Sequence, residues 1–100
     1  MTLAIVRFTA RHEQAAQVEH AVHELFDAMR EARPSGVRYL ATRHADEPEF
    51  ELLLHLADGV ENPLPGIPRA ARFRERVADW ALTDPAPRPT RLLGDYRMLG

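Results

Sequence analysis

Apolar and polar residues follow two different periods along the chain, and the changes of period divide it into elements. The segment Leu3–Thr9 is short, apolar and rich in β-branched residues, which predicts a strand buried on both faces near the centre of a sheet. From Glu13 to Ala32 the apolar residues recur at steps of three and four, which predicts a long amphipathic helix. Pro34 and Gly36 are expected to end it.

The next two segments predict a hairpin. Residues 37–44 alternate loosely, residues 45–48 have turn composition, and residues 49–57 are apolar again with Phe50, Leu52, Leu54 and Leu56 in one phase. Residues 58–66 are expected to be irregular, because prolines and glycines cluster between Gly59 and Pro68.

The last third of the chain predicts a second helix and a final strand. Pro68 suits a first helical position, and the apolar stripe that follows predicts a helix over residues 69–82. Pro85, Pro87 and Pro89 are expected to form a stiff connector. Residues 90–99 carry Leu92, Tyr96 and Met98 in one phase and are expected to form the last strand.

The resulting order, β-α-β-β-α-β, is the ferredoxin-like α+β arrangement with a four-stranded antiparallel sheet. Both helices then cover one face of the sheet and leave the other bare. The predicted strands are apolar on both faces at their centres, whereas a sheet with one solvated face would alternate with polar residues. Because so large an apolar patch rarely stays exposed, we expect a second copy of the chain to cover it in a homodimer.

Composition narrows the class of protein. One hundred residues predict a single domain over 1–100, and the absence of cysteine excludes disulfide scaffolds, zinc-thiolate sites and thiol nucleophiles. The net charge of −2 argues against nucleic acid as the main partner, and no apolar run is long enough for a membrane span. With no leader pattern at the N-terminus, we expect a cytoplasmic protein. Arginine without lysine and abundant alanine suggest a GC-rich bacterial genome.

Three strings carry a resemblance to a known family. They are Ala4-Ile5-Val6-Arg7-Phe8, the Pro34-Ser35-Gly36-Val37-Arg38-Tyr39 that follows the first helix, and residues 50–58 of the third strand. Over residues 3–58 the chain resembles the antibiotic biosynthesis monooxygenase family of the dimeric α+β barrel superfamily. The resemblance implies two copies packed sheet against sheet. It also implies a small-molecule pocket in each half, and relatives that include cofactor-independent oxygenases of quinol-like polyketides and haem-degrading enzymes.

The chain departs from that family at positions that bear on chemistry. Leu56 stands near the end of the third strand, where the family typically has tryptophan. The haem-degrading relatives use a histidine on the second helix, and no histidine follows His55 in this sequence. We therefore expect no haem, and no other cofactor.

His55 is the candidate catalytic residue, because it interrupts an otherwise apolar strand. A neutral imidazole there can act as acid, base or hydrogen-bond donor; the alternative is a structural hydrogen bond at a dimer seam. Tyr39 and Tyr96 are candidate substrate-binding donors in the same cavity, and Trp80 is a candidate wall, although all three also suit amphipathic packing.

Other polar clusters favour surface roles. His20 and His23 lie opposite the apolar stripe of the first helix, so a solvated face is a better interpretation than a metal site, and we expect no metal. The arginines at positions 69, 72, 74 and 76 can bind an anion, but a solvated face on which they pair with neighbouring carboxylates is the better interpretation.

Two functions follow as hypotheses. The first is a small enzyme resembling cofactor-independent monooxygenases or cyclases, in which His55 and the tyrosines act on an aromatic or polyketide-like metabolite. The second is a non-catalytic dimeric barrel that binds a small ligand or serves as an accessory module. A pocket with converging polar groups favours the first, and a filled interior favours the second.

Overall fold

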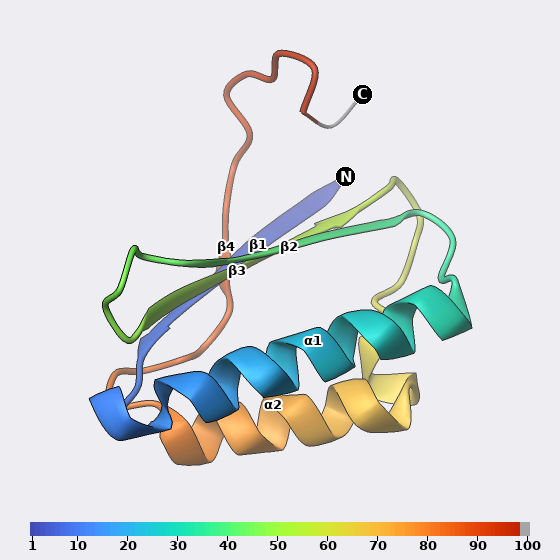
Figure 1. Ribbon diagram of the computed structural model, residues 1–100. Coiled ribbons are helices and arrows are strands. Elements are labelled where there is room, and N and C mark those ends of the chain that lie inside the picture. The colour runs from blue at the N-terminus through green and yellow to red at the C-terminus, as the bar shows by residue number, and fades with distance from the viewer. Residues whose placement is uncertain (99–100) are drawn as a thin grey trace.

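The computed structural model describes residues 1–98 and shows two layers, a sheet and a pair of helices (Figure 1). Both helices lie on one face of the sheet, as the sequence predicts, and the other face is uncovered. The elements in chain order are β1 (Thr2–Thr9), η1 (His12–Gln14), α1 (Ala15–Ala32), β2 (Val37–Arg43), β3 (Glu49–Leu56), η2 (Leu64–Gly66), α2 (Pro68–Trp80) and β4 (Arg88–Pro89).

The sheet has four antiparallel strands in the order β2-β3-β1-β4, so β1 is an interior strand as expected. Its even-numbered residues Val6 and Phe8 pack into the core, where the Phe8 and Phe50 rings stack with centroids 5.4 Å apart. The helices form the other side of the core, and their buried residues lie on the apolar stripes that the periodicity predicts. The buried helical residues are Ala15, Val18, Ala21, Leu25, Ala28, Ala70, Phe73, Val77 and Trp80.

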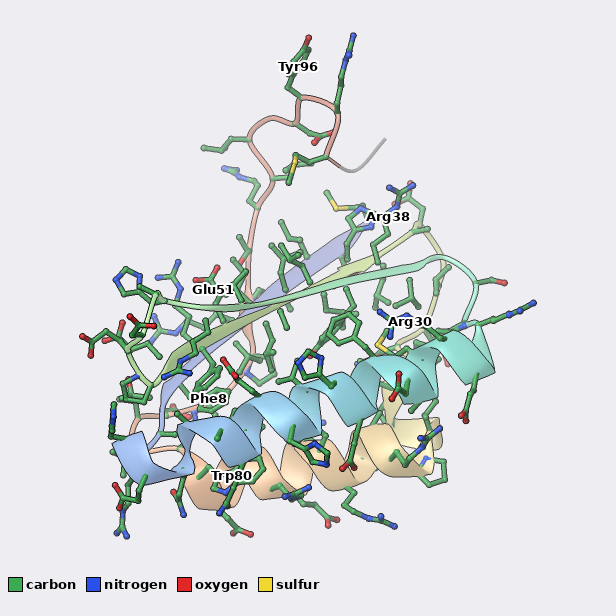
Figure 2. The ribbon with its side chains drawn as sticks, viewed as in Figure 1. Phe8, Arg30, Arg38, Glu51, Trp80 and Tyr96 are labelled. Atoms are coloured by element: carbon green, nitrogen blue, oxygen red, sulfur yellow. The ribbon has the colours of Figure 1, made fainter. Side chains whose placement is uncertain are left out.

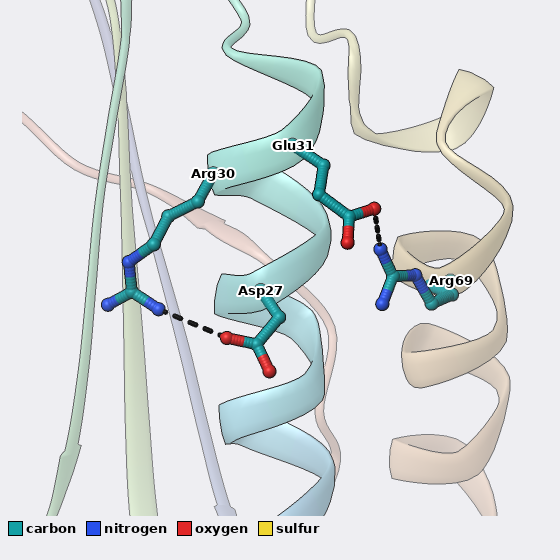
Figure 3. A network of polar contacts seen from close by, with 4 residues as sticks. All are labelled: Asp27, Arg30, Glu31 and Arg69. Atoms are coloured by element: carbon teal, nitrogen blue, oxygen red, sulfur yellow. Dashed lines mark hydrogen bonds and ion pairs between the residues drawn. The ribbon is translucent and has the colours of Figure 1, made fainter.

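Polar contacts connect the β2–β3 hairpin to α1 at one end of the molecule and α1 to α2 at the other. The Arg43 guanidinium donates to the carbonyl oxygens of Asp46 and Glu47 in the β2–β3 turn, at 3.0 and 2.8 Å, and to the Glu19 carboxylate of α1 at 3.1 Å. At the other end of the molecule, Arg69 of α2 pairs with Glu31 of α1 (Figure 3). These contacts fix the hairpin and both helices relative to one another.

The final strand is much shorter than the sequence predicts. We expected a strand over residues 90–99, but β4 comprises only Arg88 and Pro89, and Leu99 lies outside the described residues. Pro87 and Pro89 have no N–H to donate, so the prolines expected in a connector limit the ladder beside β1. One further bond, from Thr90 N to the Leu3 carbonyl at 2.8 Å, follows before the chain leaves the sheet.

Gly36 lies in the α1–β2 junction, and Gly59 is a control position for testing how tightly that junction is packed. Both have positive φ, 72° and 76°, but a Cβ at Gly36 would lie 2.6 Å from Val60 Cγ2, whereas at Gly59 it would meet open space. We expect Gly59→Ala to lower the free energy of unfolding by about 1–2 kcal/mol through backbone strain alone. Gly36→Ala should lower it by about 2–4 kcal/mol, because overpacking adds to the strain.

Urea unfolding of both variants measures this difference. Val60→Ala in the Gly36→Ala background should recover part of the loss. Equal losses in the two single variants would contradict the packing at Gly36.

Candidate functional site

The face of the sheet without helices, called the bare face below, carries the odd-numbered residues of β1 and β3 and the even-numbered residues of β2. Cross-strand pairing places them in rows, because directly paired residues share a face. Figure 2 shows Arg38 and Glu51 on this side of the sheet, while Phe8 and Trp80 lie on the helix side. The bare face comprises Leu3, Ile5, Arg7, Thr9, Arg38, Leu40, Thr42, Glu49, Glu51, Leu53 and His55.

The central row of the bare face is apolar. Ile5 pairs with Leu53, which pairs with Leu40. Leu40 is 49% exposed in the single chain. A run of three aliphatic side chains across three adjacent strands is the kind of surface that soluble proteins cover with a partner or a ligand.

A charged row borders the apolar row on one side. Arg7 pairs across the strands with Glu51, and its Nε donates to the Glu51 carboxylate at 3.0 Å; Thr42 completes the row. Because Arg7 and Glu51 neutralise each other, they form a polar border to the apolar row without giving it a strong net charge.

His55 lies on the other side of the apolar row, between Leu3 and Arg38. Its imidazole is half-buried, and its Nδ1 atom is buried without a hydrogen-bond partner among the described residues. Leaving a polar atom buried and unpaired costs about 1–3 kcal/mol, so such an atom calls for an explanation. A group that pairs with Nδ1 would remove this cost.

A hollow of about 910 Å³ lies at the charged end of the bare face. It is bounded by the sheet at Arg7, Thr42 and Glu51 and by the α2–β4 connector at Thr83 and Arg88. His55 does not line it. The hollow reaches Ile5 of the apolar row, and His55 lies on the same face but outside the hollow.

Tyr39 lies on the helix side of the sheet, away from His55. It pairs with Leu54, whereas His55 pairs with Arg38, so the two side chains project from opposite faces. The Tyr39 ring meets Phe26 of α1 edge-on, with centroids 5.6 Å apart, and burial raises the pKa of its phenol to about 12 because desolvation disfavours the phenolate. Tyr39 is therefore a neutral phenol at physiological pH.

A second, open hollow of about 480 Å³ lies on the helix side, between the end of α1 and the start of β2. Phe26, Met29, Pro34 and Val37 form apolar walls, with Arg30 and Arg33 at the rim. Phe26 also contacts Tyr39, so this hollow adjoins the buried phenol. The Nη1 atom of Arg30 pairs with the Oδ1 atom of Asp27 at 3.4 Å (Figure 3).

Trp80 and Tyr96 have opposite environments. Trp80 is buried in the core, and the Arg76 guanidinium stacks on its ring at 4.6 Å from the centroid. Tyr96 is 80% exposed and lies far out on the C-terminal segment. One chain therefore does not bring His55, Tyr39, Tyr96 and Trp80 into one cavity.

The remaining candidate ligands stay on the surface. His20 and His23 are exposed on α1, and His20 pairs with Glu24 at 2.7 Å. Within residues 1–98 no group of three histidine, aspartate or glutamate side chains is placed to hold a metal ion. Neither helix of this part of the chain is both long and apolar enough to cross a bilayer.

Sequence reasoning missed two residues of the bare face that bear on its chemistry, Arg7 and Arg38. Arg7 forms the ion pair with Glu51, and Arg38 is the direct cross-strand neighbour of His55. The alternation within each strand already places Arg7 in phase with Ile5. The neighbour of His55 on β2, however, depends on the register of the hairpin, which alternation does not give.

Comparison with known proteins supports the fold. No protein-family model matches the sequence, and no curated protein matches it. Among solved structures, a Nitrosomonas europaea protein provisionally named an antibiotic biosynthesis monooxygenase superposes with a TM-score of 0.71 at 19% identity, over 92% of this chain and 89% of that one. The NE2512 protein of unknown function from the same organism gives 0.72 at 20% identity, over 99% and 96%.

A third structure, Rv0793 from Mycobacterium tuberculosis, gives a TM-score of 0.59 at 22% identity, over 94% of this chain and 96% of that one. At these identities the likeness establishes a shared ferredoxin-like α+β fold over nearly the whole of each chain. The resemblance seen in the sequence is thus supported at the level of the fold.

Tyr39 gives the structure a pH dependence in the alkaline range. Because its pKa rises from 10.0 to about 12 on folding, the folded protein binds the phenolic proton more tightly than the unfolded chain does. The contribution of Tyr39 to the free energy of unfolding should therefore be complete below pH 10 and fall as the pH rises toward 12.

Tyr39→Phe should remove this part of the alkaline loss, and Tyr96→Phe should keep it. Urea unfolding at several alkaline pH values measures both. In Tyr96→Phe, Tyr39 is the remaining tyrosine, so its phenolate absorbance can be followed directly. A midpoint near 10 in that variant would contradict the burial of Tyr39.

Proposed function

We propose that the protein is a homodimer in which the bare faces of two copies pack against each other as a dimeric α+β barrel. The apolar row of Ile5, Leu53 and Leu40 supports this, because the helices already occupy the other face and cannot cover it. Packed sheets lie about 10 Å apart, so two such rows would fill the space between two copies.

We further propose that this dimer binds a small aromatic metabolite on the bare face and acts on it as a cofactor-independent enzyme of the monooxygenase or cyclase type. The observation that carries the proposal is the buried, unpaired Nδ1 of His55 beside the apolar row. An aromatic ring suits the aliphatic row, and a phenol can supply the hydrogen-bond partner that His55 lacks.

His55 would act as a general base in this enzyme. It would accept the proton of a phenol or of an acidic methylene, and Arg38, its neighbour on β2, would stabilise the anion that forms. With dioxygen as oxidant, the methylene would lose two hydrogens and gain one oxygen atom as a carbonyl, while the second oxygen atom leaves as water. His55 is responsible only for the proton transfer.

The positions of Tyr39 and Trp80 favour a second candidate, a dimeric barrel that binds a ligand without transforming it. Both side chains pack in the core on the helix side, so they add no donor to the surface around His55. The two candidates share the ligand site and differ in whether His55 takes a proton or only donates or accepts a hydrogen bond.

The homodimer predicts a sedimenting species near twice the chain mass of 11.4 kDa at low micromolar concentration. Leu40→Arg should shift it toward the monomer, because it places a charge in the apolar row. Ala78→Arg, at an exposed position on α2, should leave the dimer intact. A folded monomer in the unmodified protein would overturn the homodimer.

Substitutions at His55 separate its roles. In the ligand-free protein, His55→Leu should raise the free energy of unfolding by about 1 kcal/mol or more, because it removes an unpaired buried nitrogen, and it should abolish binding of naphthol followed by fluorescence. His55→Gln should retain part of the naphthol binding but lose dioxygen consumption with anthrone. His23→Gln, exposed on α1, is the matched control.

Destabilisation by His55→Leu would show that His55 pairs with a protein group and would remove the ligand site. Dioxygen consumption that survives in His55→Gln would exclude His55 as the base. Naphthol binding without any anthrone turnover by the unmodified protein would favour the binding module.

A further inference from the structure

Arg88 extends the apolar row of the bare face onto a fourth strand. It pairs with Ile5 across β1 and β4, and directly paired residues project from the same face of a sheet. The row therefore runs across all four strands, from Leu40 through Leu53 and Ile5 to Arg88. Three aliphatic side chains thus end at a guanidinium group.

The hollow at the charged end of the bare face meets the row at this guanidinium. Ile5 and Arg88 both line the hollow. Two other arginines that line it, Arg7 and Arg43, are held in ion pairs with glutamates. Arg88 is exposed, and no carboxylate of residues 1–98 pairs with it. Within this part of the chain, its charge therefore has no counter-charge from a side chain.

Carboxylates in the walls of the hollow limit the charge of an anion that can bind there. Glu49 and Asp84 line these walls. Glu49 pairs with Thr9, which lies about 13 Å along β1 from Ile5 at roughly 3.3 Å per residue. The two carboxylates repel a dianion such as a phosphate, whereas one guanidinium offers two parallel N–H groups to a monoanionic carboxylate. The hollow therefore suits a carboxylate bound to Arg88.

The size of the row indicates what kind of molecule carries this carboxylate. Neighbouring strands lie about 4.8 Å apart, so the row spans about 14 Å from β2 to β4. Its aliphatic part suits two fused aromatic rings. His55 lies beside the same row, one row further along β3 from Leu53. A hydroxyl and a carboxylate at opposite ends of the rings then correspond to His55 and Arg88.

We propose that the ligand of the bare face is a hydroxylated aromatic carboxylic acid and that Arg88 binds its carboxylate. This rests on the proposed function, in which the rings lie on the apolar row and a phenol pairs with His55. When a second copy covers the bare face, Arg88 loses hydration, and an uncompensated charge is costly there. The carboxylate supplies the missing counter-charge, so Arg88 selects acids over neutral aromatics.

Three fluorescent probes test the carboxylate: 6-hydroxy-2-naphthoate, 2-naphthol and 2-naphthyl phosphate. The unmodified protein should bind the hydroxynaphthoate about 10-fold to 100-fold more tightly than the naphthol, because a charge-assisted hydrogen bond adds to the same ring contacts. Fluorescence titration measures the dissociation constants. Equal affinity for these two probes, or tighter binding of the phosphate, would overturn the carboxylate and leave the proposed function standing.

Substitutions at Arg88 assign the effect to this side chain. Arg88→Gln keeps the backbone pairing with Ile5, and it should remove the preference for the hydroxynaphthoate while the affinity for the naphthol stays unchanged. Arg88→Lys keeps the charge but not the two parallel N–H groups, so it should restore part of the preference. Arg74→Gln, at an exposed position on α2, is the matched control and should keep the full preference.

Two results with Arg88→Gln would contradict its role. An unchanged preference would show that another group binds the carboxylate. A raised dimer dissociation constant in sedimentation, with the preference unchanged, would show that Arg88 pairs with a carboxylate of the second copy instead. Failure of the unmodified protein to bind any of the three probes would remove the ligand site, and the proposed function with it.

Discussion

The structure depends on one constraint: the centre of the sheet is apolar on both faces, at Ile5, Leu53 and Leu40 on the bare one, and the helices cover only the other. Phe50, Leu52 and Leu56 are buried beneath α1 and α2, while Leu53 and His55 point to the other side. Two helices of this length cannot wrap both faces of a four-stranded sheet, so the fold leaves an apolar surface unpaired. His55 lies on that surface, and the C-terminal segment leaves the sheet on the same side.

Local patterns predicted most of the fold because each element reports its environment through its own periodicity. The stripe on α1, the phase of β3 and the proline at the start of α2 all agree with the structure. The last strand is the exception, because β4 comprises Arg88 and Pro89 and not residues 90–99 as the alternation predicts. Leu92, Tyr96 and Met98 alternate as a strand would, but alternation reveals only that one side of a segment is to be buried. It does not reveal whether the covering surface belongs to the same chain.

The candidate site was partly predictable for a related reason. The phase of His55 follows from β3 alone, since Leu52 and Leu56 mark the core side. The side on which Tyr39 lies could not be read in the same way, because β2 has apolar residues in both phases, with Val37 and Tyr39 in one and Leu40 in the other. Only the pairing of Tyr39 with Leu54 decides it, and register is a property of two strands.

A site divided between two copies has a thermodynamic consequence that a site within one chain lacks. If the ligand contacts residues of both copies, it binds only the dimer, so it must strengthen the dimer by the same free energy by which dimerisation strengthens its own binding. Ligand affinity then depends on protein concentration wherever the dimer is partly dissociated. The unpaired nitrogen of His55 would gain its partner only in such a complex, because in the isolated chain it is buried without one.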